Sequence, residues 1–429
     1  MEELVVASNG LLHRRAFMRS GAAFAAGITG YTLTDAAYAQ QLADAPWSKS
    51  KGKALPGYET PSPNAKDVAR TLTNPNNENR TSHARTPHHL INGTFTPNGL
   101  HMVITHSGNP EIDPAQHKLV IHGLVRKPLV FTMDALMRYP MVSRMTFLEC
   151  GGNSAPLFSN EPVQGTAQLL HGLVSCAEWT GIPLSTLLDE AGIDPRAKWI
   201  VAEGADALAM SRSFPLSKGL DDTLVALFQN GEPIMPSNGY PVRLVLPGWE
   251  GNMNVKWLRR LELTETPGMT FYEARTYAPI LPGGKAYQFY FLQEVKSFIT
   301  HPSPGLKMNG PGLYEVSGVA YSATGRIAKV MVSADGGQTW AEAALQDPIL
   351  PKAFTRFRIP WRWNGGPATL QSRAWDEAGN MQPTRAEFVA KRGQTKEPIK
   401  NPLGFPSQHF NAIVSWGVDA SGEIKHVYA

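Results

Sequence analysis

The sequence predicts two domains, an α+β domain followed by an all-β sandwich of immunoglobulin type. Between residues 86 and 270, short strand patterns alternate with short helix patterns, without the regular long spacing of a doubly wound sheet. Between residues 271 and 392 the helical periodicity disappears, and alternating strands follow one another at regular intervals. At 429 residues the chain is also longer than a single hydrophobic core usually supports.

In the α+β part, two segments have clear helix boundaries. The first is "TMDALMRYP", with Asp134 near its start and Pro140 as its stop. The second is "IPLSTLLDEAG", with Pro183 in its first turn and Gly192 at its end. Around these helices we expect strands at "KLVIHGLV", "LVFTM", "KWIVAEGAD", "TLVALFQNGEPI" and "PVRLVLPGW".

In the second part, alternation of period two predicts strands at "GLYEVSGVAYS", "IAKVMVSADGGQTWAEAAL", "FTRFRIPWRW" and "ATLQSRAWDEAGN". Asp335-Gly336-Gly337 can adopt positive φ and indicates a hairpin. Residues 393–429 are interpreted as a C-terminal tail, Pro-rich at first.

The first 39 residues have the pattern of an export leader. The paired arginines Arg14 and Arg15 precede an Ala/Gly-rich stretch and then Ala37-Tyr38-Ala39, which resembles a cleavage site. Paired arginines indicate the twin-arginine route, which exports folded proteins. We therefore expect a periplasmic protein that receives a cofactor before export. The alternative is an unprocessed N-terminal helix. Residues 40–85, rich in Pro, Asn, Ser and Thr, are interpreted as a linker or arm.

Several classes of function are disfavoured by composition. The net charge of +4 is small for this length, and no Lys/Arg run exceeds a pair, which argues against nucleic acid as the main partner. No apolar run is long enough for a mature membrane span. No dinucleotide fingerprint or Walker loop is present. No C-x-x-C-H occurs, so we expect no haem attached covalently to this chain.

One of only two cysteines stands at the exit of a predicted core strand, in "RMTFLECGGNS". Cys150 is either a small core residue or a thiolate that points into a pocket, where it would suit a soft or high-valent metal. Gly151 and Gly152 would let the backbone approach a bulky ligand. In an oxidising compartment a disulfide between Cys150 and Cys176 is the alternative.

Two cations interrupt apolar sequence in "NGYPVRLVLPGWEGNMNVKWLRRLEL". Arg243 lies within a strand pattern, and Lys256 follows a Gly/Asn-rich loop. Cationic side chains in such surroundings usually face an anion such as phosphate. The alternative is that both are edge-strand charges that face water.

This segment and "TFLECGGN" together resemble the molybdenum-cofactor domain of the sulfite oxidase family. Similarity is closest to the molybdenum subunits of Sox-type sulfane dehydrogenases, and also includes "SGNPEIDPAQHKLVIHGLVRKPLVFTMDAL", "VALFQNGEPIMPSNGYP", "SADGGQTW", "LPKAFTRFRIPWRW" and "LQSRAWDEAGNMQPT". The resemblance extends from about His88 to the C-terminus. It implies a molybdenum-cofactor domain followed by a dimerisation domain.

The resemblance also implies roles for individual residues. Cys150 matches the protein thiolate on molybdenum, Tyr277 the tyrosine beside the oxo ligand, and Asn238 a position that is usually histidine. The residues that match contacts to the pterin and its phosphate are Met102, Val103, Ile104, Thr105, His106, Asp206, Arg243, Asn254, Val255 and Lys256.

Ile104 departs from the family pattern, because it stands where an arginine normally binds the sulfite anion. A free oxyanion would lose its main counter-charge there, and an unpaired charge is costly to desolvate. A sulfane sulfur bound to a carrier protein suits the change better. A shifted register could restore His101 or His106 to the role of the arginine.

The sequence therefore predicts a periplasmic molybdenum-cofactor sulfane dehydrogenase subunit that acts by oxygen-atom transfer. The resemblance implies a c-type cytochrome subunit (SoxD type) as electron acceptor, a sulfur-carrier protein (SoxYZ type) that presents the substrate, and a homodimer. Two alternatives stay open: a dehydrogenase of free sulfite, and a non-catalytic periplasmic binding protein.

Overall fold

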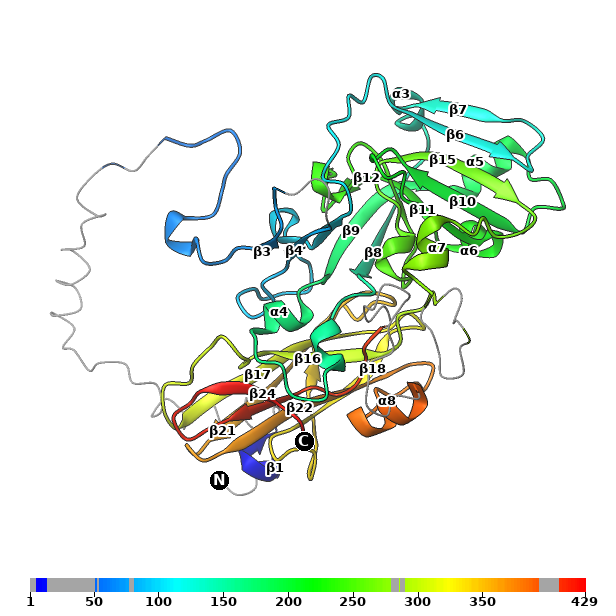
Figure 1. Ribbon diagram of the computed structural model, residues 1–429. Helices are drawn as coiled ribbons and strands as arrows, with labels where there is room; N and C mark the ends of the chain where they lie inside the picture. Colours follow the sequence, from blue (N-terminus) through cyan, green and yellow to red (C-terminus); the bar gives the residue numbers. More distant parts are fainter. Residues whose placement is uncertain are drawn as a thin grey trace.

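The computed structural model describes residues 5–13, 51, 54–76, 81–278, 285, 290–392 and 409–429. In Figure 1 the α+β domain lies at the top and the sandwich domain at the bottom. Strands dominate both domains, and the helices of the first domain are short. This confirms the predicted fold class.

Two sheets form the α+β domain. The first has the order β11-β10-β15-β6-β7, and only β15 and β6 pair in parallel. Its strands are β6 (Lys118–Gly123), β7 (Leu129–Thr132), β10 (Trp199–Gly204), β11 (Ser211–Pro215) and β15 (Leu258–Thr264). The second has the order β13-β12-β9-β8, with β14 also paired to β12. Its strands are β8 (Val142–Glu149), β9 (Val174–Pro183), β12 (Leu224–Gln229), β13 (Glu232–Pro233) and β14 (Arg243–Val245).

Helix α5 (Leu184–Ala191) ends where the local sequence predicts, whereas the first predicted helix ends at Leu136, before Pro140. Helix α5 begins after Pro183 and ends at Gly192, whose φ of 71° is easily adopted only without a Cβ. Its leucines pack into the core of this domain. The other helices are α3 (Met133–Leu136), α4 (Ala167–His171), α6 (Leu216–Asp221), α7 (Phe271–Arg275) and α8 (Arg385–Arg392). In the described part of the chain, no helix is long and apolar enough to cross a membrane.

The sandwich consists of two antiparallel sheets that share one core. The first contains β1 (Val5–Ala7), β2 (Leu11–Leu12), β16 (Lys296–His301), β17 (Gly312–Tyr321), β20 (Ala344–Leu345) and β21 (Thr355–Trp363). The second contains β18 (Ile327–Ser333), β19 (Ala341–Glu342), β22 (Ala368–Asp376), β23 (Ser415–Val418) and β24 (Ile424–Val427). Phe357 and Trp361 of the first sheet pack with Leu370 and Trp416 of the second.

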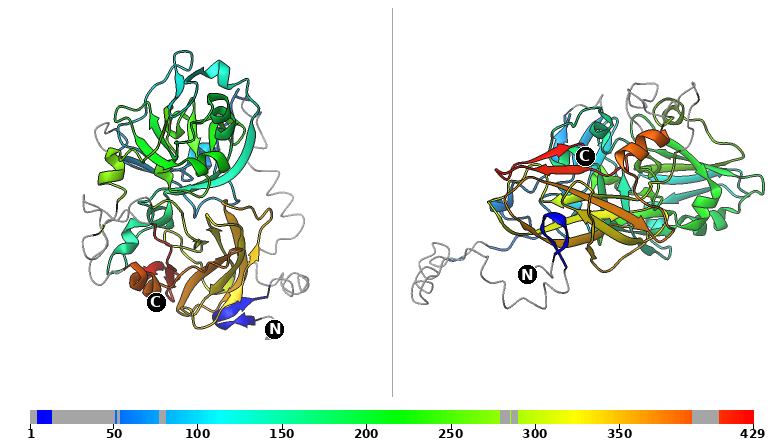
Figure 2. Two further views of the ribbon diagram at one scale, coloured as in Figure 1. Left: turned by 90° about the vertical axis from the view of Figure 1, so that its right-hand side faces the viewer. Right: turned by 90° about the horizontal axis from the view of Figure 1, so that it is seen from below.

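The ends of the chain join the sandwich, as the two views of Figure 2 show. Strands β23 and β24 come from the predicted tail, and they extend the second sheet beyond β22. Within the predicted leader, Leu11 is fully buried and pairs with Trp361. The paired arginines and the predicted cleavage site lie outside the described residues.

A third, small sheet lies beside the α+β domain. It contains β3 (Thr71–Thr73), β4 (Ser82–Arg85) and β5 (Val103–Thr105). Two of its strands come from the predicted arm of residues 40–85, so that regular structure begins before the expected start of the domain. In this register His83 lies opposite Ile104.

The buried face of α5 provides a test of the first domain's core. Leu188 is fully buried, and Leu→Ala at such sites removes transfer free energy and leaves a cavity. We expect Leu188→Ala to lower the free energy of unfolding by about 2–5 kcal/mol in denaturant titration. The exposed neighbour Asp189 offers the control, because Asp189→Ala should change the free energy of unfolding by less than about 0.5 kcal/mol. Equal effects of the two changes would contradict this assignment of the core face.

Candidate functional site

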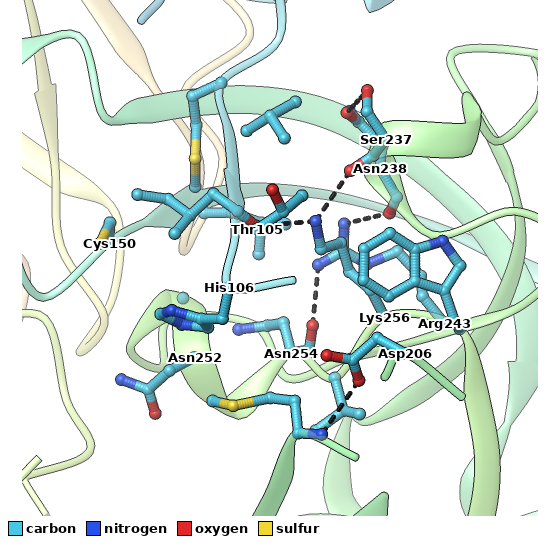
Figure 3. Close-up of a pocket in the computed structure, with 18 of the residues that line it drawn as sticks. Thr105, His106, Cys150, Asp206, Ser237, Asn238, Arg243, Asn252, Asn254 and Lys256 are labelled. Carbon is cyan, nitrogen blue, oxygen red and sulfur yellow. Dashed lines mark hydrogen bonds between the residues drawn. The ribbon is translucent and has the colours of Figure 1, made fainter. Parts of the chain in front are cut away.

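One cavity collects the residues that the sequence analysis singled out. It lies between β5, the end of β8, and the loops around β14 and η9 (Gly251–Met253), and Figure 3 shows its lining. Its empty space amounts to about 730 Å³ when the solvent at its open mouth is included. Every predicted site residue lines it: Met102, Val103, Ile104, Thr105, His106, Cys150, Asp206, Asn238, Arg243, Asn254, Val255, Lys256 and Tyr277. Their roles stay predictions.

Cys150 follows β8 directly and lines the cavity with its thiol. Both cysteines are free, so the structure contains no Cys150–Cys176 disulfide. Cys176 is instead fully buried among apolar side chains such as Phe147 and Phe298. Burial raises the pKa of the Cys150 thiol to about 12, and the charge of Arg85 acts in the opposite direction. The thiol is therefore protonated near neutral pH until a metal displaces its proton.

Gly151, which was predicted with Gly152 to let the backbone approach a ligand, packs instead against Glu250 of the loop that contains Gly251. A Cβ on Gly151 would lie 1.7 Å from Glu250 Oε1, and a Cβ on Gly251 would lie 2.7 Å from the carbonyl oxygen of Glu149. Neither glycine could carry a side chain without a shift of the loops. The missing Cβ atoms thus set how closely the Cys150 loop approaches the loop before Lys256.

Arg243 is buried and Lys256 is half-buried, and the hydrogen-bond partners of both cations are main-chain oxygens. Arg243 donates from Nη1 to Asn238 O at 2.7 Å and from Nη2 to Asn254 O at 3.0 Å. Lys256 Nζ donates to Ile104 O and to Ser237 O, both at 2.8 Å. Within the described residues neither cation lies within ion-pair distance of a carboxylate. This excludes the alternative that both face water.

The electrostatics of these two cations favour an anion in the cavity. Burial lowers the pKa of Arg243 to about 9. Burial and the neighbouring charge of Arg243 hold the pKa of Lys256 well below its usual range, with Asp206 acting in the opposite direction. A buried cation without a counter-charge is unfavourable, and a phosphate would supply that counter-charge. The donor set therefore fits a ligand with an anionic end.

The acidic side of the cavity is formed by Asp206, in the loop between β10 and β11. Its Oδ1 accepts the Met210 N–H at 3.0 Å, and its Oδ2 accepts the Ser107 hydroxyl at 3.2 Å. These bonds fix a buried carboxylate beside the cations without pairing it to either. A carboxylate held in this way can accept hydrogen bonds from the N–H groups of a heterocycle.

The β5 side of the cavity supplies no positive charge. Ile104 lines it, as predicted. Burial lowers the pKa of His101 to about 3 and that of His106 to about 4, so both rings are neutral near neutral pH. Neither histidine can therefore replace the missing arginine as a cation.

Tyr277 is backed by two charged residues that the sequence analysis missed. The Arg212 guanidinium lies over the Tyr277 ring, 4.7 Å from its centroid. Burial raises the pKa of Glu250 to about 7, and Arg212 opposes this shift. Both residues interrupt apolar or Gly-rich segments, as Arg243 does, and that signal could have identified them. Met210, Ser237, Asn252 and Trp257 also line the cavity and were not predicted.

Comparison with known families matches both domains. Residues 106–272 match the oxidoreductase molybdopterin binding domain, and residues 288–398 match the Mo-co oxidoreductase dimerisation domain. The crystal structure of the sulfane dehydrogenase SoxCD from Paracoccus pantotrophus is similar, with a TM-score of 0.84 and 40% sequence identity. The match covers 90% of this chain and 97% of that chain.

Curated relatives include enzymes with longer chains. The chain is 31% identical over 347 residues to NADH nitrate reductase 1 of Oryza sativa subsp. japonica. This alignment covers 70% of this chain and 37% of the relative. The chain is also 29% identical over 323 residues to mitochondrial sulfite oxidase of Drosophila melanogaster. That alignment covers 69% of this chain and 56% of the relative. The chain thus spans little more than a third of the nitrate reductases it matches.

Arg243 and Lys256 make the cavity a binding site for anions even without a cofactor. In the full chain produced without cofactor, we expect inorganic phosphate to raise the melting temperature. Lys256→Met should weaken phosphate binding at least about tenfold in calorimetric titration, because one charge-assisted hydrogen bond contributes about 1.5–3 kcal/mol. Lys391→Met, at an exposed ion pair with Glu294, serves as the control and should bind like the wild type. Equal binding by all three proteins would contradict the anion site.

Proposed function

The chain belongs to the sulfite oxidase family of molybdopterin oxidoreductases, and from this premise we propose that it is the molybdenum subunit of a periplasmic sulfane dehydrogenase. The observation that supports this most directly is the distribution of groups in the cavity. Figure 3 shows Cys150 on one side and Arg243 and Lys256 on the opposite side. A soft thiolate and a pair of cations are the groups that a metal and a phosphate-bearing cofactor require at its two ends.

Molybdopterin with molybdenum is the cofactor of this family, and the residues present fit it. Cys150 would be the protein ligand of the metal, and Arg243 and Lys256 would bind the phosphate. Asp206 would accept hydrogen bonds from the pterin. When bound, the cofactor supplies the oxygen-atom transfer and takes up the two electrons of sulfur oxidation. The protein contributes position, charge and exclusion of water.

Tyr277 acts as a hydrogen-bond donor to the reacting group. Burial raises its pKa well above the usual range, and the neighbouring Cys150 and Glu250 act in the same direction against Arg212. The phenol therefore keeps its proton near neutral pH and can donate. Asn238, whose Nδ2 donates to Gln229 Oε1 at 3.1 Å, contributes to the wall of the pocket.

The substrate that we propose is a sulfane sulfur bound to a cysteine of a carrier protein. This end of the cavity is formed by Ile104 and by the neutral rings of His101 and His106. A free oxyanion would enter it without a counter-charge from β5, whereas a sulfur atom on a carrier needs none.

Free sulfite is the second candidate, and Arg85 favours it. This residue ends β4, and its charge acts on Cys150. Its Nη1 donates to Thr73 Oγ1 at 2.8 Å. If the guanidinium turned toward the metal, it would supply from a different strand the charge that Ile104 lacks.

The electron acceptor that we propose is a c-type cytochrome subunit. The similar crystal structure is that of the sulfane dehydrogenase SoxCD, and this similarity supports a partner subunit for this chain. The family of residues 288–398 supports a homodimer through the sandwich domain. The periplasmic location rests on the twin-arginine pattern at Arg14 and Arg15.

The metal site is tested by replacing its thiol. In a host that makes molybdopterin, we expect the wild type to bind molybdenum and to oxidise sulfur substrates with a cytochrome acceptor. Replacing a residue that only supports a metal ligand lowers metal affinity or activity about 10–100-fold. Because Cys150 would be a ligand itself, Cys150→Ser should lower turnover at least about 100-fold. Cys176→Ser, in the apolar core, should retain activity and metal content. If mass spectrometry detects no molybdenum in the wild-type protein, the proposed function is excluded.

The choice of substrate is tested by returning a charge to β5. Ile104→Arg should lower KM for free sulfite about tenfold or more, because a hydrogen bond to a charged group contributes about 1.5–3 kcal/mol. Ile104→Met, of similar size and uncharged, is the matched control. Steady-state assays would compare sulfite with a carrier-bound sulfane. If the wild type already saturates with sulfite more readily than with the carrier-bound form, the second candidate is correct.

A further inference from the structure

A fully buried cluster of charges lies directly behind the loop that holds Cys150. Glu149, the last residue of β8, meets Lys296, the first residue of β16, and His409, in the segment before β23. Glu149 and Lys296 are each 0% exposed, and His409 is 1% exposed. The three residues come from the α+β domain, the sandwich domain and the C-terminal segment, so that the cluster joins all three.

In the cluster, Oε1 of Glu149 accepts hydrogen bonds and Oε2 lies close to His409 without a hydrogen bond of good geometry. Lys296 Nζ donates to Oε1 at 2.7 Å. His409 Nδ1 lies 3.1 Å from Oε2, and its Nε2 lies 3.0 Å from the carbonyl oxygen of Glu294. Both oxygens of this buried carboxylate therefore face a nitrogen from another part of the chain.

The same cluster holds the loop on the far side of Cys150. Asn153 Nδ2 donates to Glu149 Oε1 at 2.8 Å, and Lys296 Nζ donates to Ser154 Oγ at 3.0 Å. The Ser154 hydroxyl also lies 2.9 Å from His171 Nδ1. Ser154 has a φ of 65°, which a residue with a side chain adopts at a cost, so contacts must fix it. One ammonium therefore binds residues before and after the cysteine.

We propose that Lys296 and His409 are positioning residues for the Cys150 thiolate: the sandwich domain and the C-terminal segment hold the loop of residues 149–154 so that its sulfur faces the metal. The identity of the metal in this inference rests on the proposed function. The effect of Lys296 and His409 on the accessibility of the Cys150 thiol does not depend on that function. A purely structural role, in which the cluster only joins the domains, is the competing explanation.

The two cysteines of the chain separate these explanations. Cys176 lies on β9, the strand next to β8, and its Sγ accepts the Phe354 N–H at 3.4 Å. It does not contact the cluster through any described hydrogen bond. Global loosening would expose both thiols, whereas loosening of the Cys150 loop alone would expose only Cys150.

The experiment measures alkylation of both thiols by mass spectrometry in the full chain produced without cofactor. We expect Lys296→Met to accelerate alkylation of Cys150 at least tenfold and to leave Cys176 unchanged. In holoenzyme the same change should accelerate loss of molybdenum to a chelator by a similar factor. Lys391→Met, which removes an exposed ion pair with Glu294, is the control and should behave like the wild type.

A second variant covers the case in which Lys296→Met does not fold. The double change of Glu149→Gln with Lys296→Met removes both charges together, which buried pairs tolerate better than the loss of one partner. It should fold and still alkylate rapidly at Cys150. Equal acceleration at both cysteines, or no acceleration at either, would overturn the proposal. A wild-type protein without molybdenum would instead overturn the proposed function and leave the alkylation result intact.

Discussion

Burying the Arg243 guanidinium and the Lys256 ammonium costs free energy unless an anion lies against them. The protein places both side chains in the α+β domain without a carboxylate at ion-pair distance, within the residues described. Main-chain oxygens satisfy part of their donors, and those oxygens belong to β5, η8 (Pro236–Asn238) and the segment after η9. The same hydrogen bonds therefore join three separate loops around the space that a cofactor phosphate would occupy.

The opposite end of the cavity is constrained by close packing. Gly151 and Gly251 allow the loop of the cysteine and the loop before Lys256 to touch, and a Cβ at either position would collide with the other loop. Behind this contact, Glu149 connects the loop to Lys296 in the sandwich. The α+β domain thus does not hold the Cys150 loop alone, because the second domain contacts the residues on both sides of the thiol.

Between these two ends, the charge in the cavity changes along its length. Lys256 reaches the carbonyl oxygen of Ile104, but the side chains that line the β5 side, Ile104 and the neutral rings of His101 and His106, carry no charge. This distribution of charge underlies our proposal that the substrate is a sulfur delivered in an uncharged form.

The amino-acid pattern alone determined the two-domain class, the ends of α5 at Pro183 and Gly192, and Cys150, Arg243 and Lys256 as candidate site residues, because strand alternation, helix caps and cations in apolar segments are local signals. The other cavity residues were predicted from the resemblance to the sulfite oxidase family, not from such signals. The pattern could not determine the cluster of Glu149, Lys296 and His409. These residues are far apart in the chain, and each is by itself only one polar residue in an apolar or poorly patterned segment. Folding brings them together, and only their burial turns three isolated residues into an ion-pair network. Tertiary pairing likewise decided that β23 and β24 extend a sandwich sheet and that β4 of the predicted arm lies beside Ile104, since the partner of an edge strand is not encoded in its own alternation.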